Sequence, residues 1–90
     1  MITIELLTQL RAAAGQDALQ ISCEGGTTVS ALLSDVADAV PSIRDLLLDG
    51  DGVRHGWLMI SIDDALVARG SDPPVQCGCT VVLVSPVAGG

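Results

Sequence analysis

Residues 27–41 read TTVSALLSDVADAVP, and this stretch decides the fold because it contains the clearest helix of the chain. Its apolar residues recur at the spacing that forms a single stripe along one side of a helix. Thr27 or Thr28 is suited to cap the first turn, and Pro41 ends the helix. The stripe predicts a helix that covers one face of a sheet, through Val29, Leu32, Leu33, Val36, Ala37 and Val40.

Strands are predicted on both sides of this helix. Residues 2–7 alternate in polarity, and residues 17–23 read as a second strand. Between them, residues 9–14 are rich in helix formers, and Gly15 is placed to end one or two helical turns. The sequence before the main helix therefore predicts two strands joined by a short helical segment.

The second half of the chain adds further strands. A short second helix is predicted at 42–48, followed by a strand at 57–62 and a short strand near 65–68. The final strand covers about 80–85, and its unbroken apolar run predicts burial on both faces in the middle of a sheet. We therefore predict an α+β fold, in which a mixed sheet of four to five strands packs on one main helix.

Composition narrows the classes of partner. Ninety residues form one domain, and the net charge of −7 comes from 11 acidic residues against four arginines. An acidic surface repels nucleic acid and anionic lipid, so neither is predicted as a partner, whereas a basic protein surface suits it. No signal peptide is recognisable, and no apolar run approaches the roughly 20 residues that span a bilayer. The expected location is the cytoplasm.

The three cysteines predict neither a disulfide framework nor a metal site. An odd count argues against a disulfide framework and fits a reducing compartment. Cys77 and Cys79 are closer together than in a zinc knuckle, although Cys23 and His55 could in principle complete a ligand set. We expect the cysteines to act as small hydrophobic residues. If Cys79 is exposed, a low-yield disulfide between Cys77 and Cys79 under oxidation is the alternative. His55 is expected to be a surface or hydrogen-bonding residue.

The residues after the last strand predict a reactive tail. We divide the chain into a domain, 1–85, and an extended C-terminal tail, 86–90. Pro86 ends the strand, Val87 is expected to anchor in the mouth of a partner's tunnel, and a slender stem follows that consists of Ala88, Gly89 and Gly90. Fully extended, five residues reach at most about 17 Å. A terminal carboxylate is a poor electrophile, so a partner that uses ATP would have to activate it.

Three features together resemble the MoaD/ThiS sulfur carriers, which have the ubiquitin-like β-grasp fold. They are the order of elements, the segments Leu10–Gly15 and Thr28–Leu33, and the ending Pro86–Gly90. The likeness extends from residue 2 to residue 90 and is closest to the small subunit of molybdopterin synthase or to the carrier of cysteine synthesis. Two turns depart from the family pattern, at Gly78-Cys79-Thr80 and at Ile62-Asp63-Asp64.

The resemblance implies a reaction cycle on Gly90. An adenylating enzyme similar to ubiquitin-activating enzymes would join Gly90 to AMP, and sulfur from a cysteine-derived persulfide would then give a thiocarboxylate. The large subunit of molybdopterin synthase would accept the sulfur, in the synthesis of the molybdenum cofactor. The chain would thus be a cosubstrate with no catalytic residue, metal or bound cofactor of its own, active as a sulfurtransferase only with a large catalytic subunit.

Several alternatives stay open. The segment 52–57 is longer than a minimal connection and resembles the cysteine-synthesis carrier more than it resembles the shortest carriers. A thiamine-type carrier ranks third. A protein modifier attached through Gly90, or an interaction module with an inert tail, are further possibilities. Arg11 is a candidate to pair with a partner's carboxylate or is simply solvated. Trp57, the only aromatic residue, is either a core residue or an anchor at an interface, and partial burial is favoured.

Overall fold

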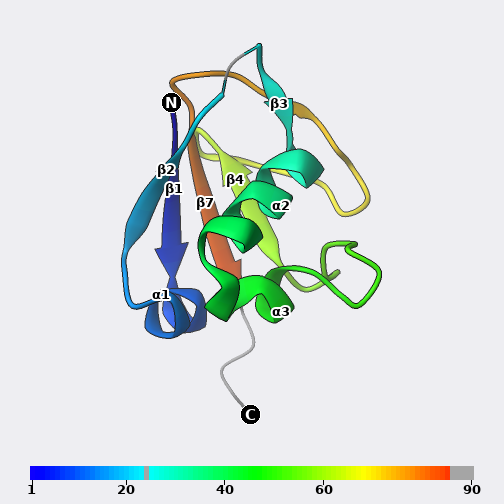
Figure 1. Ribbon diagram of the computed structural model, residues 1–90. Coiled ribbons are helices and arrows are strands. Elements are labelled where there is room, and N and C mark those ends of the chain that lie inside the picture. Colours follow the sequence, from blue (N-terminus) through cyan, green and yellow to red (C-terminus); the bar gives the residue numbers. More distant parts are fainter. Residues whose placement is uncertain (24, 86–90) are drawn as a thin grey trace.

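The computed structural model describes residues 1–23 and 25–85, and Figure 1 shows a twisted sheet with helices packed against it. The sheet has five strands in the order β2-β1-β7-β4-β5. The pair β1–β7 is parallel and the other pairs are antiparallel, so the sheet is mixed, and the predicted α+β class is confirmed. The strands are β1 (Ile2–Leu7), β2 (Ala18–Ile21), β4 (Met59–Ile62), β5 (Ala65–Leu66) and β7 (Thr80–Ser85).

The helices follow the predicted order. They are α1 (Thr8–Ala14), α2 (Val29–Ala39), the 3-10 turn η1 (Pro41–Ile43) and α3 (Arg44–Leu47). Gly15 ends α1 with a left-handed φ of 73°, a conformation that glycine adopts without the strain of a Cβ. The predicted second helix at 42–48 is therefore a 3-10 turn that continues into one short α-helical turn.

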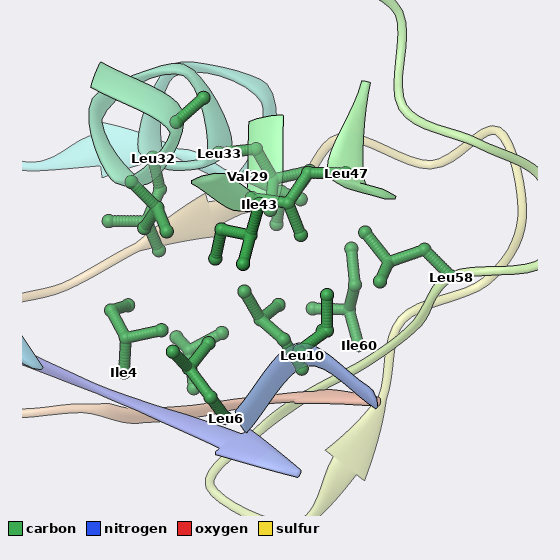
Figure 2. Close-up of a cluster of buried hydrophobic side chains, with 14 of the residues drawn as sticks. Ile4, Leu6, Leu10, Val29, Leu32, Leu33, Ile43, Leu47, Leu58 and Ile60 are labelled. Atoms are coloured by element: carbon green, nitrogen blue, oxygen red, sulfur yellow. The ribbon is translucent and has the colours of Figure 1, made fainter. Parts of the chain in front are cut away.

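Helix α2 supplies one side of the core. All six residues of the predicted stripe are buried, and Figure 2 shows several of them facing side chains of the sheet and of α1. The side chain of Thr28 caps the helix by accepting a hydrogen bond from the Ala31 N–H at 3.3 Å. The core is built from aliphatic side chains, since the chain has no phenylalanine or tyrosine.

Strand β7 lies in the middle of the sheet, as predicted, between β1 and β4. The prediction of burial on both faces was wrong. Val81, Leu83 and Ser85 are buried against the helices, whereas the alternate residues Thr80, Val82 and Val84 are only half-buried. The reason is that the helices cover one face of the sheet and leave the outer face open, which Figure 1 shows.

A second, two-stranded sheet was not predicted. It pairs β3 (Thr27–Thr28) with β6 (Pro74–Val75), in antiparallel orientation. Strands of two residues are too short for alternation to be read, and Pro74 lacks the N–H of a strand interior. This small sheet holds the segment that precedes α2 against the segment that leads to β7.

Asp72 links the segment that leads to β7 with the start of α2 through hydrogen bonds. Its carboxylate accepts hydrogen bonds from the Ser30 N–H and from the Ser30 hydroxyl, both at 2.8 Å. These two donors lower the pKa of Asp72, with a smaller contribution from Arg54. The backbone N–H groups of Val53 and Asp51 likewise donate to the Asp49 carboxylate and lower its pKa. The pKa of Asp63 is lowered in the same way, by the Thr80 N–H and then the Cys79 thiol.

The cysteines contradict the sequence analysis. Cys23 and Cys77, 54 residues apart, form a disulfide that joins the segment after β2 to the segment before β7. Cys79 is a half-buried free thiol, so the alternative Cys77–Cys79 bond is also wrong. The odd number of cysteines was a poor guide to disulfide bonding, because two cysteines that are far apart in the sequence pair and the third stays free. The inference of a reducing compartment therefore loses its premise.

Two further observations concern only residues 1–23 and 25–85. No helix among them is both long and apolar enough to cross a membrane. No group of three histidine, cysteine or acidic side chains among them is arranged to hold a metal ion.

The lowered pKa values predict that stability falls in acid. A carboxyl whose pKa is lower in the folded state stabilises the fold above its unfolded pKa, near 3.8 for Asp72, and loses that contribution as pH falls through the folded pKa. Urea unfolding followed from neutral pH to pH about 3 should show a falling midpoint. Asp72→Asn should lower the midpoint at neutral pH and flatten the pH dependence. Asp35→Asn, an exposed residue of α2, is the control, and equal curves for both variants would contradict the assignment.

The disulfide predicts the number of reactive thiols. Unreduced, denatured protein should titrate one thiol with Ellman's reagent, that of Cys79, and reduced protein should titrate three. Because the bond restricts the unfolded chain, reduction should lower the free energy of unfolding by about 2–4 kcal/mol. Cys79→Ser should titrate no thiol before reduction. Three thiols in the unreduced wild type would refute the Cys23–Cys77 bond.

Candidate functional site

The candidate site is the end of the sheet at which β7 stops. There β1 ends at Leu7, β7 ends at Ser85, and the antiparallel β4 begins at Met59. Ser85 is the last described residue, and the predicted tail starts immediately after it. Five residues of the predicted site lie outside the described residues: Pro86, Val87, Ala88, Gly89 and Gly90. Their roles stay predictions.

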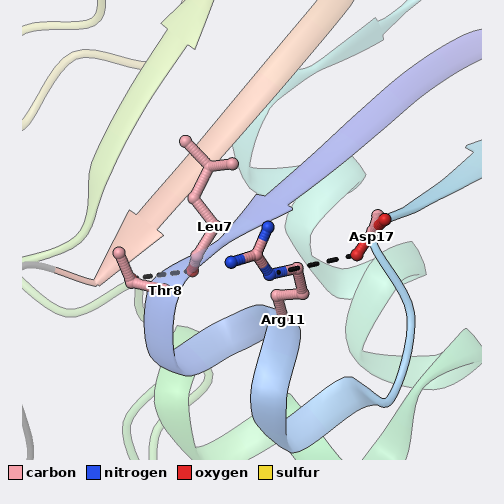
Figure 3. A network of polar contacts seen from close by, with 4 residues as sticks. All are labelled: Leu7, Thr8, Arg11 and Asp17. Atoms are coloured by element: carbon pink, nitrogen blue, oxygen red, sulfur yellow. Dashed lines mark hydrogen bonds and ion pairs between the residues drawn. The ribbon is translucent and has the colours of Figure 1, made fainter.

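Thr8 holds the last residue of β7. It forms a parallel bridge with Ser85, and its hydroxyl lies 3.0 Å from the Ser85 carbonyl oxygen and 2.8 Å from that of Leu7. The single hydroxyl proton is therefore shared between two acceptors. Thr8 has a φ of 53°, which is uncommon for a β-branched residue. Its place at the junction of β1 and α1 is visible in Figure 3.

An apolar row crosses the outer face of the sheet beside this point. Leu7 and Met59 flank Val84 in register, one on each neighbouring strand. Leu7 is 39% exposed and Met59 is 45% exposed, although both are large apolar side chains. A contiguous exposed apolar row next to a strand end is typical of a protein-binding surface.

Arg11 lies on α1, about one helical turn after Leu7 in the sequence. It is exposed, and its Nε is 3.9 Å from the carboxylate of Asp17, a long ion pair that Figure 3 shows. An exposed pair at that distance contributes little to stability, so the guanidinium is available to another carboxylate. The contact of Arg11 with a partner stays a prediction.

Trp57 is exposed, with 45% of its surface accessible to solvent, so the partial burial that the sequence analysis favoured was wrong. Its ring stacks on that of His55, with centroids 4.0 Å apart and planes inclined by 10°. The Nε2–H of His55 donates to the Asp45 carbonyl oxygen at 2.8 Å, so His55 has the predicted hydrogen-bonding role. The stack fixes the exposed indole just before β4.

The topology gathers these residues around the end of β7. Arg11 follows β1 and Trp57 precedes β4, and β1 and β4 are the two neighbours of β7. Sequence analysis named Arg11 and Trp57 but missed Thr8, Leu7 and Met59. The alternation of β1 and β4 is a signal that could have found Leu7 and Met59, because each lies on the face opposite the buried positions. No sequence signal marks the left-handed conformation of Thr8.

Comparison with known proteins gives one family and a consistent set of structures. The model of the ThiS family matches residues 4–90. A search of curated proteins gave no match. CysO from Mycobacterium tuberculosis, described as an antigen, is 25% identical, with a TM-score of 0.75 and coverage of 97% of this chain and 100% of that one.

Two further solved structures are similar over their full lengths. A chain in the BexX/CysO complex from Amycolatopsis orientalis is 25% identical, with a TM-score of 0.78 and coverage of 100% of both chains. SAMP1 from Haloferax volcanii is 22% identical, with a TM-score of 0.84 and coverage of 99% and 98%, which shows a shared fold.

The Thr8–Ser85 contact predicts a specific pattern of substitutions. Thr8→Val removes the hydroxyl while keeping the β-branched shape, and should lower the free energy of unfolding by about 1 kcal/mol. Thr8→Ser keeps the hydroxyl and should stay close to the wild type. Urea unfolding measures the stability, and amide chemical shifts of residues 84 and 85 report the local change. Equal stability and equal shifts in the two variants would show that the hydroxyl does not anchor β7.

Proposed function

The chain belongs to the ThiS family of small ubiquitin-like sulfur carriers and modifiers, and on that basis we propose that it carries sulfur on Gly90. The observation that best supports the proposal is the position of β7. This strand lies in the centre of the sheet and ends at Ser85, anchored to Thr8. The five remaining residues, Pro86–Gly90, begin at a fixed point beside an exposed apolar row.

The proposed chemistry needs an activating partner. The carboxylate of Gly90 is ionised at neutral pH and does not react with sulfur nucleophiles until it is activated. An adenylating enzyme would bind ATP and transfer AMP to this carboxylate, with release of pyrophosphate. A persulfide of the sulfur donor would then displace AMP and form an acyl disulfide with Gly90. A second thiol of the partner would cleave its S–S bond, which releases the thiocarboxylate on Gly90 and leaves a disulfide on the donor. In this cycle the chain is a cosubstrate, and the catalytic groups and ATP belong to its partners.

The surface around the end of β7 is proposed as the docking face for these partners. Leu7, Met59 and Val84 would be covered by an apolar surface, which removes them from water. Arg11 would pair with an acidic group of the partner. Such docking fixes the body of the domain while Gly89 and Gly90, which lack side chains, enter a narrow active site.

The acceptor of the sulfur is proposed to be the large subunit of molybdopterin synthase. A second candidate is an enzyme that transfers sulfur to O-phosphoserine in cysteine synthesis. A role in cysteine synthesis is supported by the long connection between α3 and β4, which includes residues 52–57 and the His55–Trp57 stack. A minimal carrier would have a shorter connection there. Activation by ATP places the cycle in the cytoplasm, where the Cys23–Cys77 bond would be exposed to reduction.

Intact-mass spectrometry of protein isolated from its native cells tests the proposal. A thiocarboxylate replaces oxygen by sulfur and should add about 16 Da on Gly90. Gly90→Ala should keep the fold, yet lose thiocarboxylate formation by about 10- to 100-fold, because the added Cβ misplaces the carboxylate. Gly50→Ala is the matched control, because open space surrounds Gly50 and its φ is not left-handed.

Other outcomes identify the alternatives. Accumulation of isopeptide-linked conjugates through Gly90 would show a protein modifier. Full function after deletion of Gly89 and Gly90 would show an interaction module with an inert tail. Incubation of the thiocarboxylate with each candidate acceptor enzyme would distinguish molybdopterin synthesis from cysteine synthesis.

A further inference from the structure

A groove of about 840 Å³ lies along the β5 side of the molecule and borders the apolar row at Met59. Its floor is made by core side chains, among them Leu33, Leu58 and Ile60. Its rim carries Trp57 and Leu66, which are 45% and 72% exposed. The groove is thus an open, mainly apolar cleft with two large exposed side chains at its border.

Strand β5 forms an open edge of the sheet beside this groove. The Val67 N–H donates to the Ile60 carbonyl at 2.9 Å, so residues 60 and 67 are a hydrogen-bonded pair. The next pair, Ser61 and Leu66, is then of the non-hydrogen-bonded kind, and the N–H and C=O of Leu66 point away from β4. Residues 1–23 and 25–85 provide no hydrogen bond to either group. Leu66 thus presents a free backbone donor and acceptor.

Positive charge collects at the same groove. Two of the four arginines, Arg54 and Arg69, line it, whereas Arg11 and Arg44 pair with acidic residues elsewhere. Arg54 donates to the carbonyls of Ala68 and Ser71, and no carboxylate of the described residues lies within ion-pair distance of Arg69. The one acidic residue of the groove, Asp72, is already occupied by Ser30. In a chain with net charge −7, this is a local cationic surface.

We propose that this groove binds an extended peptide segment of a partner protein in which apolar and acidic residues alternate. The segment adds to the sheet as a strand beside β5, with its backbone bonded to the N–H and C=O of Leu66. Its apolar side chains contact Trp57 and Leu66, and its carboxylates face Arg69. A second copy of this chain is disfavoured as the occupant because two molecules of charge −7 repel.

The inference does not depend on the chemistry of Gly90. Peptide binding at β5 and thiocarboxylate formation are measured separately, so either can fail without affecting the other. Gly90→Ala should bind the peptide as the wild type does.

The first experiment uses a defined probe and the single tryptophan. The probe is an acetylated and amidated heptapeptide in which Val and Asp alternate, and the control peptide has Lys in place of Asp. Because Trp57 is the only aromatic residue, its fluorescence reports the groove without interference. The acidic peptide should shift the emission of Trp57 and the amide resonance of Leu66 in a saturable way. Arg69→Gln should weaken binding by about two- to fivefold, and added salt should have the same direction of effect.

A pair of substitutions at Leu66 tests backbone pairing. Leu66→Pro removes the outward N–H but leaves the bond between Val67 and Ile60 unchanged. It should weaken binding by about 2- to 10-fold relative to Leu66→Ala, which keeps the N–H. Hydrogen exchange provides a second measure that needs no substitution. The Leu66 amide should become protected when the peptide binds, whereas the Val67 amide, already bonded, should change little.

Three results would overturn the proposal. One is the absence of any change at Trp57 and Leu66 up to the solubility limit of the acidic peptide. Another is equal binding of the acidic and lysine peptides. The third is a Leu66 shift that depends on protein concentration alone, together with a dimeric mass by sedimentation, since that would make the groove a contact between copies of this chain.

Discussion

The parallel pairing of β1 with β7 is the constraint on which the rest of the structure depends. Residues 3–7 pair in register with residues 80–84, so the first and the last strand of the domain are direct neighbours. Parallel neighbours cannot be joined by a hairpin, so the chain between them includes a crossover that passes over one side of the sheet. Helices α2 and α3 occupy that side and bury one face of β7, while its other face stays open.

The same pairing gives the candidate site its position. Because β1 and β7 run in the same direction, β7 ends where β1 passes into α1, and Thr8 meets Ser85 there. The antiparallel β4 begins at this end of the sheet and contributes Met59. A central strand held on both sides makes a firm base for residues that follow it. The proposed role of Gly90 relies on that base rather than on any reactive group within the described domain.

Sequence patterns predicted those parts of the fold that are set by neighbours along the chain. The stripe of α2, the cap at Thr28, the stop at Gly15 and the central place of β7 all follow from local spacing and turn chemistry. The parts that were missed depend on residues distant in sequence. The Cys23–Cys77 bond spans 54 positions, and the Asp72–Ser30 contact spans 42, so neither leaves a local pattern. The reactive tail stays a prediction from Gly89, Gly90 and the family resemblance, while Thr8 and the apolar row became visible only once the strands were in register.

The covalent link between Cys23 and Cys77 turns the middle of the chain into a closed ring, with α2, β4 and β5 inside it and β1, β2 and β7 outside. An unfolding motor that pulls from beyond Ser85 would first draw β7 out as a single thread. At Cys77 it would have to pull two chain segments at once, because the disulfide keeps Cys23 attached to Cys77. A translocation pore wide enough for one extended backbone would stall there until the link was cut, so the protein would resist mechanical degradation at one fixed position.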